Sequence, residues 1–218
     1  MATTINYERL YEYRFRDVDQ TAKVAVWSEI ARFVHEQLGR PSRVLDPAAG
    51  TCEFINAVPA AERWAIDRVS FDGVRTAPGT KLVISDVMDA DLPADYFDGA
   101  FVSNFLEHLP TPDSIAAFLE RMHGWMSPGG KIAILGPNIR YCPDVYWDCA
   151  DHWLGLTHVA IEEHLYAAGF KPRVTHPRFL PYSFRGGLPA SAKLTNLYLR
   201  TPAAWRVLGK QFLVIAER

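Results

Sequence analysis

The stretch VLDPAAGTCEFINAV, residues 44–58, decides the fold. Its first three residues have the pattern of a buried strand that ends in an acid, Asp46, and apolar residues return at helical spacing from Phe54 onward. Between these two segments, residues 48–52 have almost no side-chain bulk. Small residues at a turn from strand to helix let a ligand approach the backbone closely. The stretch therefore predicts a ligand-binding turn at the end of the first strand of an α/β sheet.

Segments with strand and helix patterns alternate along the rest of the chain. We expect strands at residues 42–46, 63–67, 81–85, 98–103, 131–136, 171–180 and 212–218. We expect helices at residues 7–38, 52–59, 111–126 and 157–168, the third with Thr111 as its N-cap and Pro112 in its first turn. Strands that alternate with helices form parallel, doubly wound sheets. The predicted α/β fold is Rossmann-like and doubly wound, a seven-stranded, mostly parallel sheet with an antiparallel last strand and helices on both faces.

Acidic residues stand at the ends of three successive predicted strands. Asp46 ends the first, Asp67 ends the second, and Asp86 follows the third within SDVMDADLPADYFDGAFVSNFLEHLP, residues 85–110. With the small-residue turn and with WMSPGGKIAILGPN, residues 125–138, this order resembles the motifs of class I S-adenosylmethionine-dependent methyltransferases. The resemblance covers about residues 40–180 and the last strand. It implies a methyltransferase that uses S-adenosyl-L-methionine and releases S-adenosyl-L-homocysteine.

The resemblance also implies roles for individual cofactor-binding residues. Ala48, Gly50 and Cys52 stand at the three glycine positions of the family's first motif, so two of the three glycines are replaced by other small residues. A carboxylate at Asp67 suits the ribose diol, because it accepts both O–H bonds. The other implied contacts are Asp46 in the cradle, Asp86 and Val87 at the adenine, Asn104 near the methyl group and Arg14 at the methionine carboxylate. The alternatives are a turn cap for Asp67, a loop acid for Asp86 and a surface charge for Arg14.

The segment SNFLEHLP, residues 103–110, resembles the end of the family's fourth strand, which faces the cofactor's methyl group. Methyl transfer to a hydroxyl requires removal of its proton, and histidine titrates near neutral pH. His108 is therefore our first candidate for the general base, with Glu107 beside it, and His158 is the second. The alternative is that His108 only positions its neighbours. We expect O-methylation first, because it gives the histidine a role, and N-methylation of an amine as the alternative.

Some relatives with a similar E-x-x-E-H segment hold magnesium there. In this chain Asn104 replaces the first acid, and a single carboxylate, Glu107, holds magnesium poorly. We therefore expect no metal at this site.

A run of aromatic and polar residues, YWDCADHWLGLTH at 146–158, follows the fifth predicted strand. It should line the acceptor side of the crevice, because open α/β sheets bind ligands beyond the carboxyl ends of their strands. Aromatic faces beside acids and histidines suit a ring that carries hydroxyl groups. We expect Tyr146, Trp147, Asp151 and His152 to bind the acceptor, a small molecule or a saccharide. An ordinary packed loop is the alternative.

The bulk composition is that of one globular domain, with 218 residues, 49% hydrophobic and 22% charged. We divide it into an N-terminal helical cap (1–40), a cofactor-binding core (41–180) and a helical insert (181–211) before the last strand. No apolar stretch approaches the roughly 18 residues of a membrane-spanning helix, and the N-terminus lacks the apolar segment of a secretory signal. The three cysteines lack metal or redox spacing. We expect a cytoplasmic protein.

Charge is distributed unevenly along the chain. Between Glu163 and Glu217 there is no acidic residue, but there are eight lysines and arginines. Such a stretch favours an anionic partner, either the acceptor or a membrane surface touched by residues 181–211. A solvated basic face and a homodimer contact are the alternatives. We do not expect nucleic acid as a partner, because no recognition motif is present.

Two other classes of protein compete with a methyltransferase. A nicotinamide-dependent oxidoreductase explains the turn and Asp67, but its fingerprint places the last glycine one position later and leaves SNFLEHLP without a role. A non-catalytic binding module with the same fold explains the replaced glycines at Ala48 and Cys52. Affinity for S-adenosylmethionine distinguishes a methyltransferase from a non-catalytic binding module, because a binding module need not bind the cofactor.

Overall fold

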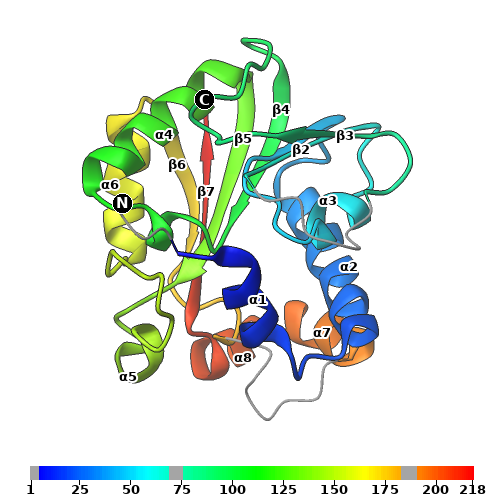
Figure 1. Ribbon diagram of the computed structural model, residues 1–218, viewed down its shortest axis with the longest axis vertical. Helices are drawn as coiled ribbons and strands as arrows, with labels where there is room; N and C mark the ends of the chain where they lie inside the picture. The colour runs from blue at the N-terminus through cyan, green and yellow to red at the C-terminus, as the bar shows by residue number, and fades with distance from the viewer. Residues whose placement is uncertain (1–4, 69–75, 183–190) are drawn as a thin grey trace.

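The computed structural model describes residues 5–68, 76–182 and 191–218. Its seven-stranded sheet has the order β3-β2-β1-β4-β5-β7-β6 (Figure 1). The strands are β1 (Arg43–Asp46), β2 (Glu62–Asp67), β3 (Thr80–Ile84), β4 (Phe97–Ser103), β5 (Met126–Pro137), β6 (Lys171–His176) and β7 (Gln211–Glu217). Strands β1 to β5 pair in parallel, and β7 lies antiparallel between β5 and β6. The predicted fold, with its antiparallel last strand, is confirmed.

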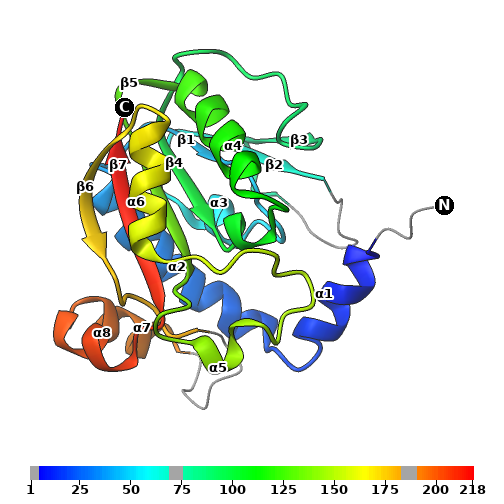
Figure 2. The ribbon, with the colours of Figure 1, turned by 90° about the vertical axis from the view of Figure 1, so that its left-hand side faces the viewer.

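Helices cover both faces of the sheet (Figure 2). They are α1 (Tyr7–Phe15), α2 (Gln20–Gln37), α3 (Glu53–Ala57), α4 (Pro112–Trp125), α5 (Pro143–Tyr146), α6 (His158–Ala167), α7 (Ala192–Leu199) and α8 (Pro202–Leu208), with a 3₁₀ turn, η1 (Leu106–His108). Within the described ranges, no helix has both the length and the apolar character to cross a membrane.

Two apolar cores hold these layers together. Leu45 of β1 packs in a cluster with residues of α4 and α6, whereas Val44 packs in a second cluster with residues of α2, α3, α7 and α8. Successive residues of a strand point to opposite faces, so adjacent apolar residues in β1 serve both cores. This burial on both faces explains why the first strand reads as a continuous apolar run.

The N-terminal segment forms two helices, so the prediction of one helix over residues 7–38 is wrong. The side chain of Asp19 accepts hydrogen bonds from the backbone N–H groups of Thr21 at 2.8 Å and Ala22 at 3.1 Å. An N-cap residue has extended rather than helical backbone angles, so Asp19 begins α2 and prevents α1 from continuing into it. α1 has no buried residue, and its place against the core depends on polar contacts.

Two other predicted elements are shorter than expected, and proline explains both. α3 ends at Ala57 rather than at residue 59, because Pro59 disfavours helical backbone angles at Val58 before it. β6 ends at His176 rather than at residue 180, because Pro177 has no N–H for the ladder. Phe179 then donates its N–H to the carbonyl of Gln211, where the chain passes the beginning of β7.

Candidate active site

The turn between β1 and α3 has the backbone of a ligand cradle. Gly50 (φ +52°) and Cys52 (φ +63°) both lie in the left-handed region, and the N–H of Cys52 closes a tight turn onto the carbonyl of Ala49 at 2.7 Å. A Cβ placed on Gly50 would meet no atom of the described residues within 4 Å, so among these residues the space in front of the turn is open. The side chain of Cys52 is 1% exposed and turned inward. The replaced glycines therefore leave this cradle open to the backbone approach that S-adenosylmethionine requires.

Two of the predicted acids shape this turn from opposite sides. Asp67, at the end of β2, accepts a hydrogen bond from the N–H of Gly50 at 2.7 Å. Asp46, at the end of β1, is 2% exposed. Burial raises the pKa of Asp46 to about 8, and the nearby charges of Asp67 and Glu53 add to this rise. A cationic group bound at the turn would favour the charged form of Asp46, so the acid set fits a sulfonium cofactor.

Asp86 and Val87 form the next turn, after β3. Asp86 accepts the N–H of Met88 at 2.9 Å and lies 3.7 Å from the guanidinium of Arg68. The side chain of Val87 is 6% exposed and belongs to the core, whereas Met88 is 40% exposed. The side chain that this turn can offer to an adenine ring is therefore that of Met88, and the roles of Asp86 and Val87 stay predictions.

A buried ion pair supports the cradle, and sequence reasoning did not find it. Lys23 of α2 is 6% exposed; its ammonium lies 2.7 Å from the carboxylate of Glu53 and donates to the hydroxyl of Thr51 at 3.1 Å. Lys23 stands on the same helix face as Val26 and Ile30, which are core residues. A lysine on an apolar helix face was the available signal, because a buried charge needs a partner.

His108 stands at the end of η1, just beyond β4, and its ring is fixed by Asp151. Its Nδ1 donates to the backbone carbonyl of Asp151 at 2.8 Å and lies 3.4 Å from the carboxylate of the same residue. A carbonyl oxygen only accepts, so Nδ1 carries the proton and the neutral ring has its lone pair on Nε2. The structure therefore gives His108 the tautomer of a proton acceptor, with a carboxylate behind it.

Arg14 neutralises that carboxylate. The Asp151 side chain is 1% exposed and forms an ion pair with the Arg14 guanidinium of α1. Burial would lower the pKa of Arg14, but the hydrogen bond and charge of Asp151 outweigh it and raise that pKa. Burial would likewise raise the pKa of Asp151, yet the hydrogen bond from Arg14 and the nearby His108 hold it below its usual range. Both groups therefore stay charged, and the role of Arg14 at the methionine carboxylate of the cofactor stays a prediction.

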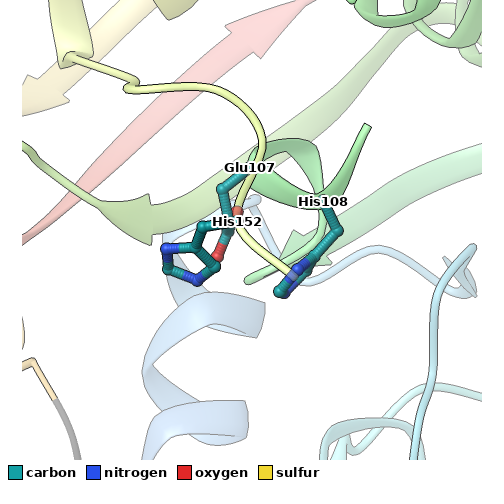
Figure 3. Close-up of side chains that lie close together, drawn as sticks. All are labelled: Glu107, His108 and His152. Carbon is teal, nitrogen blue, oxygen red and sulfur yellow. The ribbon is translucent and has the colours of Figure 1, made fainter. Parts of the chain in front are cut away.

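Glu107 and His152 complete the cluster around His108, and Figure 3 shows the three side chains close together. Their ligand atoms lie within 4.8 Å of one another. Glu107 is 2% exposed, and burial raises its pKa. Burial lowers the pKa of His152 to about 4, so His152 is neutral at pH 7. These groups are also of the types that bind divalent cations, but Nε2 of His108 can hold a cation or a proton, not both.

Tyr11 of α1 bridges the two halves of the site, and sequence reasoning did not single it out as a site residue. Burial raises the pKa of its phenol to about 12, and the charges of Asp151, Asp67 and Glu107 contribute to this rise. The phenol therefore lies within electrostatic range of acids in the cradle and in the histidine cluster. α1 therefore brings Tyr11 to the site, and it belongs to the segment that the sequence assigns to an N-terminal helical cap.

The remaining predicted residues lie at several places. His158 accepts a hydrogen bond from the side-chain amide of Asn138 at 2.9 Å and stacks near Tyr141, in a group separate from the cluster of Figure 3. The hydroxyl of Tyr146 is occupied, because it donates to the carbonyl of Leu154 and accepts from the N–H of Leu156. Trp147 is 54% exposed. Asn104 is exposed and left-handed (φ +48°) directly after β4.

Comparisons with known proteins agree with this geometry. Residues 38–134 match the family described as "Methyltransferase domain", and no curated protein matches the chain. An S-adenosylmethionine-dependent methyltransferase from Archaeoglobus fulgidus is 20% identical, with a TM-score of 0.60 over 98% of this chain and 100% of that one. The 1,6-didemethyltoxoflavin-N1-methyltransferase of Burkholderia thailandensis, solved with S-adenosylhomocysteine, is 21% identical, with a TM-score of 0.60 over 100% and 91%.

A third similar structure is the N-methyltransferase NodS of Bradyrhizobium japonicum in complex with S-adenosylhomocysteine. It is 14% identical, with a TM-score of 0.65 over 97% of each chain. At these identities the likeness concerns the fold, which is shared along almost the whole chain. Residues 38–134 are thus similar to a methyltransferase domain, and the fold of the chain is that of S-adenosylmethionine-dependent methyltransferases.

Proposed function

We propose that this methyltransferase transfers a methyl group to a hydroxyl of a small molecule or saccharide, and that His108 is the general base. The observation that carries the proposal is the hydrogen bond from Nδ1 of His108 to the carbonyl of Asp151, which leaves the lone pair on Nε2. The cluster follows the carboxyl end of β4, beside the cradle after β1, where open α/β sheets bind their ligands. We also propose that the cap, core and insert work as a single domain.

The reaction requires the protein to position the acceptor and to remove the proton of its hydroxyl. When bound, S-adenosylmethionine supplies a methyl group already activated on a sulfonium. Nε2 of His108 would accept the hydroxyl proton as the acceptor oxygen takes up the methyl group. The imidazolium that results lies 3.4 Å from the carboxylate of Asp151, which stabilises it. The products are the methyl ether, S-adenosylhomocysteine and a protonated His108.

The loop after β5 supports an acceptor that carries a ring. Trp147 and Trp153 are 54% and 56% exposed, so two large aromatic faces stand at the surface of this loop. Aromatic faces stack on sugars and aromatic rings, and the neutral His152 can bond a ring hydroxyl. We propose Trp147 and His152 as acceptor contacts. Asp151 contributes indirectly, through His108, and Tyr146 holds the loop in shape.

N-methylation is the second candidate, because two of the similar structures are named as N-methyltransferases. A neutral amine attacks through its own lone pair and needs no base before the transfer. The two reactions therefore differ in how strongly they depend on His108. The non-catalytic alternative differs from both, since it does not require cofactor affinity.

The first test is calorimetric titration with S-adenosylhomocysteine, with NADH as the control ligand. We expect S-adenosylhomocysteine to bind and NADH not to bind. If neither ligand binds, the result would support the binding-module alternative.

Methyl transfer is then measured on a panel of sugars, phenols and matched amines. His108→Gln should lower kcat by ~10²–10⁴ on hydroxyl acceptors without changing affinity for S-adenosylhomocysteine. His158→Gln is the matched control, and if it abolishes turnover while His108→Gln does not, the base is His158.

A further inference from the structure

The outer faces of α7 and α8 expose aliphatic side chains to solvent. Leu194 and Leu197 of α7 are 50% and 62% exposed, and Val207 and Leu208 of α8 are 72% and 42% exposed. Exposed cations alternate with them at Lys193, Arg200, Arg206 and Lys210. We call these eight residues the α7–α8 surface. A surface that combines aliphatic and cationic groups is typical of segments that lie on membranes.

The inner faces of the same helices are well packed, so the exposed residues are not a sign of a loose segment. Leu199 is 5% exposed and Trp205 is 6% exposed, both within one of the two apolar cores. The indole N–H of Trp205 donates to the carbonyl of Tyr198 at 2.8 Å, and Asn196 donates to Glu29 of α2 at 2.7 Å. The two helices are therefore fixed against the body of the protein and present their outer faces to a partner.

The charge of this region is opposite to that of the rest of the chain. Residues 164–216 hold eight lysines and arginines and no acid, whereas the other residues hold 15 lysines and arginines against 25 acids. A molecule with such a charge asymmetry orients in the field of an anionic surface, with its cationic end toward that surface. The net charge of −2 of the whole protein is thus compatible with attachment through one end only.

The chemistry of the α7–α8 surface favours lipid over the two other partners. Stacking on nucleic-acid bases requires aromatic groups, but Trp205 and Tyr198 point inward and the exposed groups are aliphatic. A twofold dimer through the same surface would place its four cations against their own copies. An anionic lipid layer satisfies both features, because headgroups pair with the cations and the acyl region accepts the aliphatic side chains.

We propose that the α7–α8 surface attaches the protein to an anionic membrane surface. The attachment would place the active site near the bilayer, because α8 leads into β7 at Gln211, which pairs with Pro137 at the carboxyl end of β5. Figure 1 shows α1, α7 and α8 in the lower half of the molecule, and Figure 2 shows α1 on the opposite side of that half from α8. The proposal stands apart from the reaction and holds for an O- or an N-methyltransferase.

The test is flotation of the whole protein with phosphatidylcholine vesicles that contain or lack phosphatidylglycerol. We expect binding to the phosphatidylglycerol vesicles alone, weakened by salt. The double variant Leu197→Ser with Val207→Ser should bind about tenfold more weakly, because two inserted side chains are lost. Arg200→Gln with Arg206→Gln should also weaken binding. Tyr166→Ser on α6, 75% exposed and outside the surface, is the matched control and should bind like the unchanged protein.

Melting temperature and S-adenosylhomocysteine affinity confirm that each variant is folded, and exposed positions should leave both unchanged. Failure of the unchanged protein to bind phosphatidylglycerol vesicles at low salt would overturn the proposal. So would equal binding to pure phosphatidylcholine. Sedimentation that shows a dimer, separated into monomers by the Leu197 and Val207 substitutions, would assign the surface to a second copy. Capture of an oligonucleotide without vesicle binding would assign it to nucleic acid.

Discussion

Asp46, in the turn that we assign to the cofactor, is a single residue that lowers the stability of the protein. A carboxyl group that is 2% exposed and close to Asp67 and Glu53 is costly to ionise, and its pKa rises to about 8. Above pH 4 the unfolded chain ionises this group freely, whereas the folded chain resists until about pH 8. The acid therefore reduces stability progressively as the pH rises across that range.

Replacing Asp46 with Asn should remove this penalty. We expect Asp46→Asn to be more stable than the unchanged protein at pH 7, by on the order of a few kcal/mol, and to differ little near pH 4. Urea unfolding at the two pH values measures this difference. Affinity for S-adenosylhomocysteine should fall, since the acid lies at the turn that we assign to the cofactor. An equal gain in stability at both pH values would contradict the linkage argument.

The individual residues of the site differ in how far the sequence reveals them. Asp67 stands at the end of β2 and Gly50 in the turn after β1, where local pattern indicates both, and the structure brings them into direct contact. Lys23 and Tyr11 reach the site from helices at the N-terminal end of the chain, so local pattern does not give their partners in the site. The pairing of Arg14 with Asp151 spans 137 residues and depends on how α1 packs. Sequence reasoning therefore identified residues at strand ends better than those brought in by packing.

At the scale of elements, α1 depends on one ion pair more than on apolar packing. The helix has no buried residue, and its Arg14 is bound to an Asp151 side chain that is 1% exposed. The ring of Phe15 adds a contact with the ammonium of Lys23 at 4.7 Å. The ion pair joins α1 to the loop that holds His108, so loss of the ion pair should loosen the helix from the site.

The Arg14–Asp151 ion pair can be tested by a double-mutant cycle. Arg14→Gln leaves a buried carboxylate without its cation and should cost roughly 3–5 kcal/mol of unfolding free energy. Asp151→Asn in the same chain should recover part of that loss, because the unpaired charge is gone. Urea unfolding gives the free energies, and hydrogen exchange over residues 7–15 reports release of α1. Independent, additive effects of the two substitutions would show that the pair is not coupled.

The helix boundaries agree with the prediction where the sequence contains a clear N-cap residue. Thr111 caps α4 as predicted, with its hydroxyl accepting the N–H of Ser114 at 3.1 Å and Pro112 in the first turn. The break between α1 and α2 was missed, because Asp19 lies inside a run whose apolar spacing suits one long helix. The side chain of Asp19 competes locally with the helix, and apolar periodicity does not register such competition.

At the scale of the whole molecule, the alternation of strands and helices was enough to predict the class of the sheet. Its strand order was not derivable from periodicity, because β6 and β7 are neighbours along the chain but β7 enters between β5 and β6. Among the described strands, β6 pairs with β7 alone. This insertion is a property of long-range pairing, which local pattern does not encode.

The inserted strand predicts how the molecule responds to a deletion. Removal of residues 211–218 should detach β6 along with β7, since β6 reaches the sheet through β7. Limited proteolysis should then cut within residues 171–176, whereas in the full chain that segment should be protected. Continued protection of residues 171–176 in the shortened chain would mean that β6 can pair with β5 directly.

The place of β7 also has a consequence for biosynthesis. A ribosome releases β5 and β6 before it releases β7, so the growing chain carries the exposed edge of β5 for as long as translation of the intervening residues takes. During that interval the nascent polypeptide can hold its first five strands together but cannot close the sheet. Until β7 is made, the apolar edge at residues 131–137 lacks its partner strand and is open to chaperones. Slow translation of the segment before β7 should therefore lower the yield of folded protein.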